Sequence, residues 1–324
     1  MTTRERVLEL FESNKGVYFS GEEIAQKLCV SRAAVWKAVK NLREDGYQID
    51  AVTNRGYCLS VETDILSPQG IAKYLDEECK NLDMTVLPVV SSTNTLVREK
   101  AGQGLPEGYT VISNEQTEGR GRFGRSFFSP EGTGVYMSIL LRPSHYSAGQ
   151  AVRITTMAAV AMCEAIEAVS GEKAKIKWVN DIFVRGKKVC GILTEGSFDM
   201  ESGMLDYAVL GVGVNVYRPS GDFPKELEQI AGAVFDHPQK DVKNHLAAAF
   251  LNQFMKYYRA QDLADYIGKY QSRSLAVGKE VMVISGNRSC KAFAYGVDEE
   301  CHLLVRYEDG TTESLSHGEI RIRL

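Results

Sequence analysis

Hydrophobic residues recur at helical spacing in three short runs within the first sixty or so residues. Ser20 and Glu23 form the pair typical of a capping box at the start of the second run, and Ser31 caps the third, 32–44. Two short strand-like runs then flank Thr53–Arg55. Two helices joined by a tight turn, followed by a hairpin, predict a winged helix-turn-helix over residues 1–64.

Residues 65–274 mix apolar strand-like runs with longer helical runs and form the predicted central domain. The pattern predicts an opening helix at 69–82. Several of the strands follow one another without a helix between them. This order favours a mixed or antiparallel sheet with helices packed against it, an α+β fold. The predicted strands are 85–90, 110–115, 135–141, 175–179, 189–196 and 207–216, and the predicted longer helices are 93–101, 147–169 and 242–260.

Residues 275–324 contain only short strand-like runs and turns. A break is expected at Gly286–Asn287, and Asp309–Gly310 is a strong hairpin signal. Roughly five short strands in under about fifty residues predict a small β-barrel as the C-terminal domain.

Composition then limits the class of protein. The 324 residues are 44% hydrophobic and 25% charged, as in ordinary globular proteins of about two or three domains. A net charge of −4 excludes a coat of nucleic acid along the whole chain, so a DNA-binding surface must be local. The seven cysteines include no C-x-x-C pair, which indicates reduced thiols in the cytoplasm. Neither a signal peptide nor a membrane span is expected, because charges interrupt the most apolar helix.

Basic residues gather on the outward face of the third predicted helix and at the tip of the hairpin. Phosphate contacts need local positive charge even in an acidic protein, so this pattern favours DNA binding. A small helical interaction module stays the alternative. Trp36 is expected in the core. The residues expected to contact DNA are Arg32, Lys37, Lys40, Arg43 and Arg55.

The segment Gly119–Arg125 alternates glycines and arginines. Its glycines let a ligand approach the backbone, and its guanidinium groups suit carboxylates and phosphates. It matches G-x-G-x-x-G, but a dinucleotide site needs a helix after the motif, whereas 126–132 is rich in turn residues. That interpretation is therefore rejected, and a solvated basic loop is the alternative.

Other polar residues stand where predicted strands end. Ser92–Asn94 begins a predicted helix, and Gln116 precedes the glycine/arginine loop with both a donor and an acceptor to offer. Lys177–Asp181 closes another apolar strand. Helix capping and ordinary solvation explain each placement taken singly.

A buried polar residue marks the last long strand of the central stretch. Asn215 lies in an almost wholly apolar run, and a buried amide needs hydrogen-bond partners. Gly211 and Gly213 precede it and are expected to leave space where side chains would otherwise stand.

The ordered set of motifs resembles biotin protein ligases. With the predicted winged helix-turn-helix and small barrel, the resemblance covers nearly the full chain and extends to bifunctional bacterial biotin ligases and biotin-operon repressors. It implies an enzyme that makes biotinyl-AMP from biotin and ATP and transfers biotin to a lysine of a biotin carboxyl carrier protein. The motifs that carry the resemblance are Ser92–Asn94, Gln116, Gly119–Arg125, Lys177–Asp181, 188–195 and 211–216.

The resemblance also implies roles for particular residues. Lys177 and Arg122 would be catalytic, with Lys177 between the carboxylate of biotin and the α-phosphate of ATP. Arg122, Lys177, Asn180 and Asn215 would contact ATP, and Asp181 would lie near Mg²⁺. The implied biotin contacts are Ser92, Thr93, Asn94, Gln116, Arg120, Gly121, Arg122 and Lys188.

Two positions depart from the family pattern. Val179 stands where the family usually has proline, and a small effect is expected. Phe127 stands where the family often has tryptophan, so stacking on the adenylate is expected to be weaker.

By the same resemblance, biotinyl-AMP would act as corepressor and promote a homodimer. The dimer would bind operator DNA that controls biotin synthesis and transport genes. The carrier would belong to acetyl-CoA carboxylase or a related carboxylase. No membrane partner is expected.

Adenylate formation fits these residue types, because it needs positioning and positive charge and no protein nucleophile. The chain lacks a P-loop motif. The glycine/arginine loop is expected to close over the intermediate and exclude water. Three alternatives remain open: a ligase for another acyl acid such as lipoate, a biotin-sensing repressor without catalysis, and a ligase whose N-terminal domain no longer binds DNA.

Overall fold

The computed structural model describes the whole chain except residues 145, 148, 149, 200, 261, 286, 287, 317, 323 and 324. The break expected at Gly286–Asn287 therefore lies outside the described residues. The chain forms two compact units, one of residues 1–80 with 238–249 and one of residues 81–237 with 250–324. Each unit is considered separately below.

The first unit contains the predicted winged helix-turn-helix. Its elements are α1 (Thr3–Glu12), α2 (Gly21–Leu28), α3 (Arg32–Glu44), β1 (Ile49–Val52) and β2 (Gly56–Leu59). The capping box of Ser20 and Glu23 is present, and Ser31 caps α3. The apolar faces of the three helices meet in one core with residues of the hairpin, which explains why the pattern predicted this fold. Core residues include Val7, Leu8, Phe11, Ile24, Val35, Val39, Leu42 and Leu59.

The helix expected at 69–82 is wrong. The structure has α4 (Pro68–Ala72) and, separately, a 3-10 turn at Glu77–Cys79. At the end of α4, the ammonium group of Lys73 bonds the Glu12 carboxylate at 2.7 Å and also pairs with Asp241. The partners of Lys73 at the end of the helix lie far away in the sequence. The local spacing of apolar residues therefore could not show where the helix ends.

The second unit is built on a mixed seven-stranded sheet, as predicted. The strands are β3 (Met84–Leu87), β4 (Thr110–Ser113), β5 (Gly134–Leu141), β6 (Ala174–Lys177), β7 (Asp181–Val184), β8 (Lys187–Phe198) and β9 (Leu205–Asn215). Their order is β3-β4-β5-β9-β8-β7-β6. Among the strands described here, β3 and β4 pair in parallel and the other neighbours pair antiparallel; short connections join β6 to β7, β7 to β8 and β8 to β9.

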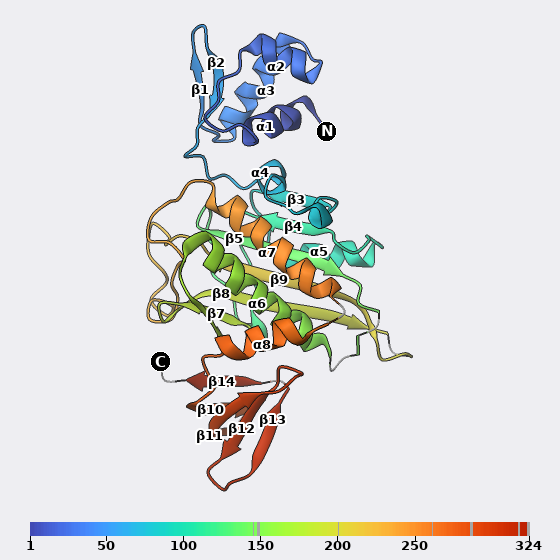
Figure 1. Cartoon of the computed structure of the whole chain (residues 1–324), viewed down its shortest axis with the longest axis vertical. Helices are drawn as coiled ribbons and strands as arrows, with labels where there is room; N and C mark the ends of the chain where they lie inside the picture. The colour runs from blue at the N-terminus through green and yellow to red at the C-terminus, as the bar shows by residue number, and fades with distance from the viewer. Residues whose placement is uncertain are drawn as a thin grey trace. The chain divides into compact units, whose positions relative to one another are not determined.

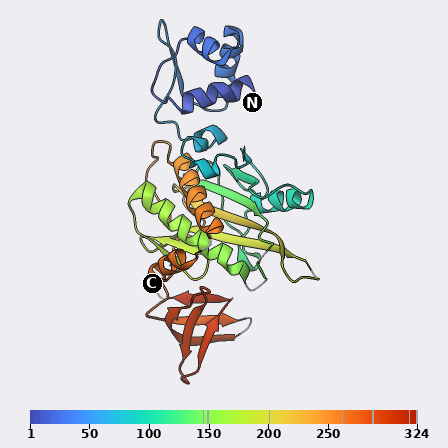
Figure 2. The ribbon, with the colours of Figure 1, turned by 45° about the vertical axis from the view of Figure 1, so that its right-hand side comes forward.

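Helices cover this sheet. The helix α5 (Thr93–Gly102) packs on β4, β5 and β9, and α6 (Ala151–Ser170) crosses β6 to β9 (Figures 1 and 2). The helix α7 (Val242–Arg259) runs through both units, and α8 (Ala264–Arg273) packs on α6. None of the helices in the described ranges combines the length and apolarity that crossing a bilayer requires. None of the seven cysteines, all within the described residues, forms a disulfide, and Cys163 and Cys190 are fully buried, as expected of small core residues.

The C-terminal segment forms a five-stranded antiparallel sheet. Its strands are β10 (Lys279–Ser285), β11 (Arg288–Val297), β12 (Leu303–Tyr307), β13 (Thr312–Leu315) and β14 (Glu319–Ile322), in the order β13-β12-β11-β10-β14. Within the described residues β13 and β14 are the two edge strands of this antiparallel sheet, which forms the C-terminal domain predicted as a small β-barrel. Side-chain contacts with the central domain include a hydrogen bond and an ion pair. Trp178 Nε1 donates to the Cys301 carbonyl at 3.1 Å, and Arg153 pairs with Glu300 at 2.6 Å.

Candidate active site

One cavity of about 580 Å³ in the second unit is lined by every residue that the sequence predicted to contact biotin, ATP or Mg²⁺. Its walls come from the start of α5, residues 116–128, the turn between β6 and β7, strands β8 and β9, and β14. Segments that lie far apart in the sequence therefore meet here. The predicted residues that line it are Ser92, Thr93, Asn94, Gln116, Arg120, Gly121, Arg122, Lys177, Asn180, Asp181, Lys188 and Asn215.

The glycine/arginine loop forms a narrow flap, residues 119–127. Its two arms are held by backbone bonds, from Gly121 N to the Arg125 carbonyl at 2.7 Å and from Phe127 N to the Gly119 carbonyl at 2.8 Å. A Cβ on Gly119 would lie 2.3 Å from the Phe127 carbonyl oxygen, so only glycine permits this approach. No helix follows the flap, since the chain continues into β5. The geometry thus agrees with the rejection of a dinucleotide-binding loop.

Lys177 supplies an unpaired positive charge to the cavity. It ends β6 and stands opposite Asp181 in the hairpin with β7. Among the described residues no hydrogen bond or ion pair reaches its Nζ atom, although the side chain is half-buried. Burial lowers the pKa of Lys177, and the nearby Asp181 carboxylate partly opposes that effect. A partly desolvated ammonium group without a partner is suited to an anionic ligand.

Arg122 directs a second charge into the same region. Its guanidinium donates to Asn180 Oδ1 at 3.1 Å and to the Gly318 carbonyl at 3.2 Å. Asn180 is itself oriented, because its Nδ2 donates to the Ile192 carbonyl at 2.8 Å. Burial lowers the pKa of Arg122, yet a guanidinium stays charged at neutral pH.

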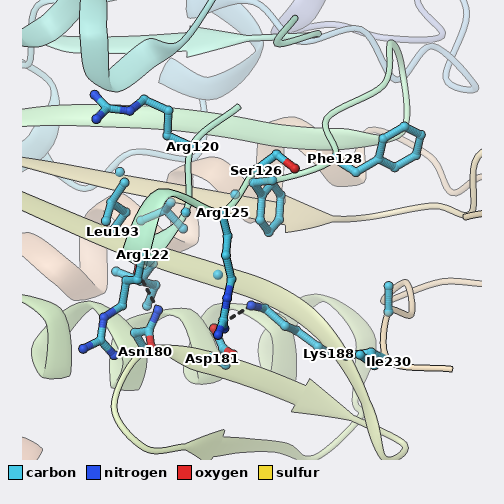
Figure 3. Close-up of a pocket in the computed structure, with 18 of the residues that line it drawn as sticks. Arg120, Arg122, Arg125, Ser126, Phe128, Asn180, Asp181, Lys188, Leu193 and Ile230 are labelled. Atoms are coloured by element: carbon cyan, nitrogen blue, oxygen red, sulfur yellow. Dashed lines mark hydrogen bonds and ion pairs between the residues drawn. The ribbon is translucent and has the colours of Figure 1, made fainter. Parts of the chain in front are cut away.

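Figure 3 shows Arg122 and Arg125 reaching from the flap toward Asn180 and Asp181, while Arg120 extends away from them. The dashed line at Lys188 marks its ion pair with Asp181, at 2.7 Å. Arg125 pairs with Glu319 of β14 at 2.6 Å, which raises the pKa of the arginine and lowers that of the carboxyl. Positive charge therefore exceeds negative charge at this end of the cavity.

Neutral polar groups line the other end. Gln116 Oε1 accepts from the Thr93 backbone N–H at 3.0 Å, and Gln116 Nε2 donates to Ser129 Oγ at 3.0 Å. Ser92 is the N-cap residue of α5, but its hydroxyl does not cap the helix and has no hydrogen-bond partner among the described residues. An amide held in a fixed orientation beside an unused hydroxyl can recognise a small polar ring.

The two glycines of β9 make room for other side chains, as expected. A Cβ at Gly211 would lie 2.0 Å from Asn94 Oδ1, and one at Gly213 would lie 2.6 Å from Cε1 of Phe127. Gly191, paired with Gly213 across the sheet, would place its Cβ 3.1 Å from the same ring. The Phe127 ring therefore sits over a floor of backbone inside the cavity.

An apolar part of the wall, in residues 223–231, was not predicted from the sequence. Phe223 meets Phe128 edge to face, with ring centroids 6.5 Å apart, and Ile230 is 53% exposed. Asn215 Nδ2 donates to the Gly232 carbonyl at 3.0 Å and ties this segment to β9. The segment contains proline, lysine and glutamate residues and has no clear hydrophobic period, so no signal for it was visible in the sequence. The exposed Ile230 indicates a binding surface only because it lies beside the cavity.

In the first unit, the basic residues predicted to contact DNA are exposed on α3 and on the hairpin: Arg32, Lys37, Lys40 and Arg55. The Arg55 guanidinium lies over the Tyr18 ring, 4.0 Å from its centroid. Arg43 is also on the surface, but it donates twice to the Ile49 carbonyl, at 2.9 and 2.6 Å. This side chain therefore holds the hairpin against α3.

The expectation that Trp36 lies in the core is wrong. Trp36 is 59% exposed, on the flank of α3 next to Lys40, whose ammonium lies 5.8 Å from its ring. The core is filled by Val35 and Val39 of the same helix. At 100° per residue, Trp36 falls beside that apolar stripe rather than within it.

Family models match three parts of the chain. Residues 3–58 match an HTH domain, residues 86–215 match the biotin/lipoate A/B protein ligase family, and residues 276–323 match the biotin protein ligase C-terminal domain. Together these matches follow the order of the structural elements described above.

Curated relatives share this organisation along nearly their whole length. The bifunctional ligase/repressor BirA of Bacillus spizizenii is 33% identical over 95% of both chains, and that of Escherichia coli is 28% identical over 95% of this chain and 94% of its own. The structure of a biotin protein ligase from Aquifex aeolicus in complex with biotin and ATP matches with a TM-score of 0.63 and 26% identity, over 74% of this chain and 98% of that one. The chain belongs to the family of bifunctional biotin protein ligase/repressors.

Proposed function

We propose that this chain joins biotin to ATP as biotinyl-AMP and then transfers biotin to a lysine of a biotin carboxyl carrier protein, and that the intermediate makes it a repressor. The single observation that carries the catalytic part is the half-buried, unpaired Lys177 beside Arg122 in a cavity whose other end is polar and uncharged. The similarity to biotin ligases supports the choice of acid.

The neutral end is the proposed seat of the biotin rings. Gln116, with both a donor and an acceptor, suits a ureido group, and the Ser92 hydroxyl is available for a further bond. Phe127 would pack on the rings from the side of the Gly213 floor. The valeryl chain would then extend toward Lys177.

In the proposed first step, a carboxylate oxygen of biotin attacks the α-phosphorus of ATP and the bond to pyrophosphate breaks. Lys177 and Arg122 would neutralise the two anions and the charge that builds on the phosphoryl oxygens. In the second step, the neutral amine of the carrier lysine attacks the acyl carbon, AMP leaves, and the amine loses a proton. No protein nucleophile is needed.

The apolar wall at 223–231 is the proposed seat of the adenine base, with Asn215 holding that wall in place. Asn180, fixed by Ile192 and bonded to Arg122, would face the phosphates. Lys188 would lie next to the same anionic groups, since it too lines the cavity.

Magnesium would accompany ATP in this proposal. Within the described residues no cluster of three or more His, Cys, Asp or Glu side chains could hold a metal ion. Mg²⁺, however, commonly binds through one or two carboxylates together with substrate phosphates. Asp181 fits that role if Mg²⁺ replaces Lys188 as the partner of its carboxylate. The ion would supply positive charge to the departing pyrophosphate.

The flap would protect the mixed anhydride from water. Arg122 already connects the flap to Asn180 and to Gly318, and Arg125 connects it to Glu319. A ligand below the flap would add a further partner for its cations.

Replacing Gly213 with alanine should weaken biotin binding about tenfold or more. The added Cβ would lie 2.6 Å from the Phe127 ring and push it into the proposed ring site, and overpacking of this kind costs about 1–3 kcal/mol. Titration calorimetry with biotin measures the change. Gly268→Ala is the matched control, since nothing lies within 4 Å of its Cβ. Equal biotin affinity of both variants would contradict the placement of Phe127.

The value of kcat/KM for biotin should fall as the pH rises through the alkaline range. This fall should begin at a lower pH than the deprotonation of a solvent-exposed lysine would produce. Lys177 must carry its proton to pair with the substrates, and burial lowers its pKa from 10.5. The quantity to measure is kcat/KM for biotin across the alkaline range, which reports the free enzyme. In Lys177→Arg this fall should move out of the range, because arginine does not titrate there. An identical profile in both proteins would rule out Lys177 as its source.

We propose that the N-terminal domain binds an operator with two half-sites as a homodimer, with biotinyl-AMP as corepressor. Its exposed cations on α3 and the hairpin support DNA binding, and Trp36 joins them as a proposed contact. A symmetric dimer matches a palindromic site. The proposed substrates, ATP and a carboxylase carrier, place this activity in the cytoplasm.

Lys37→Ala should weaken binding to all DNA sequences alike and reduce the salt slope of log K by about 0.9, the value for one lost phosphate contact. Gel-shift titrations with biotin and ATP at several salt concentrations provide the measurement. Lys173→Ala, an exposed lysine of the other unit, is the control and should keep the slope. An unchanged slope in Lys37→Ala would remove that residue from the interface.

The direct test incubates the purified chain with biotin, ATP, magnesium and a carrier domain, and measures the mass of the carrier. One lysine should gain one biotinyl group. Lipoate offered in place of biotin should leave the carrier unmodified. Transfer of lipoate alone, or binding of biotin without transfer, would support the ligase for another acid or the non-catalytic repressor instead.

A further inference from the structure

We propose that Glu195 of β8 is a positioning residue, which fixes Asn94 in the ring site and anchors Arg120 at the base of the flap. The inference rests on the proposed function and assigns one carboxylate outside the cavity to two parts of the site. Asn94 lies at the start of α5, and Arg120 lies in the first arm of the flap.

The Asn94 amide can adopt one orientation only. Its Nδ2 donates to Glu195 Oε2 at 2.8 Å, and its Oδ1 accepts from Ser138 Oγ at 2.6 Å. A carboxylate only accepts hydrogen bonds, so the NH₂ group must face Glu195 and the oxygen must face Ser138. Asn94 is 4% exposed and fills the space above Gly211, so this orientation is also sterically fixed.

Further hydrogen bonds connect Asn94 with the proposed ring site. Ser138 Oγ lies 2.7 Å from Thr93 Oγ1, so its single proton is shared between Thr93 and Asn94, and Thr93 donates to Gln116 Oε1 through both its backbone N–H and its hydroxyl. A chain of polar groups thus runs from Glu195 to Gln116. Buried networks of this kind hold their geometry only while each member is satisfied.

The other oxygen of Glu195 holds the flap. Glu195 Oε1 lies 3.2 Å from Arg120 Nη1, and Arg120 extends away from Arg122, Asn180 and Asp181 (Figure 3). The resemblance implied that Arg120 contacts biotin. In the proposed arrangement the Arg120 side chain anchors the base of the flap to Glu195 in place of that contact.

An ordinary surface ion pair would contribute little here. Arg98 shows the comparison, since it lies 3.8 Å from the same carboxylate with a side chain 46% exposed. The pair with Arg120 differs in being shorter, 3.2 Å against 3.8 Å, and in joining the base of the flap to the carboxylate that holds Asn94. Loss of the Glu195 charge should therefore disturb both Asn94 in the ring site and Arg120 at the base of the flap.

The test is a double-mutant cycle of Glu195→Gln and Arg120→Ala, read by biotin-dependent pyrophosphate exchange. Glutamine keeps the shape of glutamate but replaces one carboxylate oxygen with an NH₂ donor, so either Asn94 Nδ2 or Arg120 Nη1 faces a donor in place of its acceptor. Glu195→Gln should raise KM for biotin about tenfold, the loss expected for one hydrogen bond to a charged group, with kcat nearly unchanged. Arg120→Ala should add nothing to Glu195→Gln, because both act through one contact.

Two controls separate this role from general stability. Arg98→Ala should leave KM, kcat and the melting temperature as they are. Glu195→Asp, which keeps the charge, should restore part of the biotin affinity lost in Glu195→Gln.

The inference would be overturned if the increase in KM for biotin in the double variant equalled the product of the increases in Arg120→Ala and Glu195→Gln. Arg120 would then act on the ligand directly. A lower melting temperature of Glu195→Gln with unchanged KM would overturn it too. Failure of the proposed function would be seen in the unmodified chain, as pyrophosphate exchange that depends on another acid and not on biotin. The same double-mutant cycle would then be measured with that acid.

Discussion

Replacing Lys177 with alanine should lower kcat/KM for biotin-dependent pyrophosphate exchange by about 100- to 1000-fold, the usual loss for one preorganised group that stabilises transition-state charge. Lys177 is half-buried, lines the cavity and has no bonded anion among the described residues. Its positive charge is therefore available to the two substrates, which repel each other. Removal leaves Arg122 to oppose that repulsion with less charge.

Lys175→Ala is the matched control, because Lys175 stands two residues earlier on β6, is exposed, and bonds the Ser272 carbonyl outside the cavity. It should keep the activity of the unmodified chain. Similar losses in both variants would mean that positive charge in this strand acts generally, and the assigned role of Lys177 would be wrong.

Replacing Arg122 with glycine should release biotinyl-AMP about 10- to 100-fold faster. The guanidinium makes hydrogen bonds to Asn180 and Gly318, and the loss of one bond to a charged group, about 1.5–3 kcal/mol, is enough for a change of this size. Without them the flap loses its connection to the β6–β7 turn and keeps, toward the C-terminal sheet, the pair of Arg125 with Glu319. The measurement is the decay of bound, radiolabelled adenylate after dilution, together with biotin labelling of added bystander proteins.

Arg125→Gly provides the comparison for that experiment. Arg125 is the next arginine of the flap, its side chain is 62% exposed, and its pair with Glu319 is at the surface, where ion pairs are weak. Release should therefore be only slightly faster in Arg125→Gly. If Arg122→Gly retains the adenylate as long as the unmodified chain, the flap does not act as a lid.

The sequence predicted the parts of the fold that follow a single local period. Strands such as 135–141 and 207–216 were expected nearly at their observed bounds, because their apolar runs are long and end at turn residues. The helix α8 and the strand β7 were not expected. The pattern of α8 is short and charged, and Asp181 at the start of β7 was interpreted as the end of the preceding strand.

That interpretation placed Lys177 and Asp181 on one strand end, whereas they face each other across a hairpin. The site residues that were predicted nevertheless all line the cavity, because the resemblance rests on motifs rather than on strand bounds. Trp36, Glu195 and the apolar wall at 223–231 could not be assigned from sequence. Their meaning depends on exposure and on partners that lie far away along the chain.

A crystal structure of the chain with biotinyl-AMP tests the central claim most directly. The account predicts that Lys177 Nζ lies within hydrogen-bonding distance of the phosphoryl oxygens, with Arg122 folded over the same group and the biotin rings against Gln116 and Phe127. An adenylate bound elsewhere, or one in this cavity with Lys177 turned toward bulk water, would contradict it.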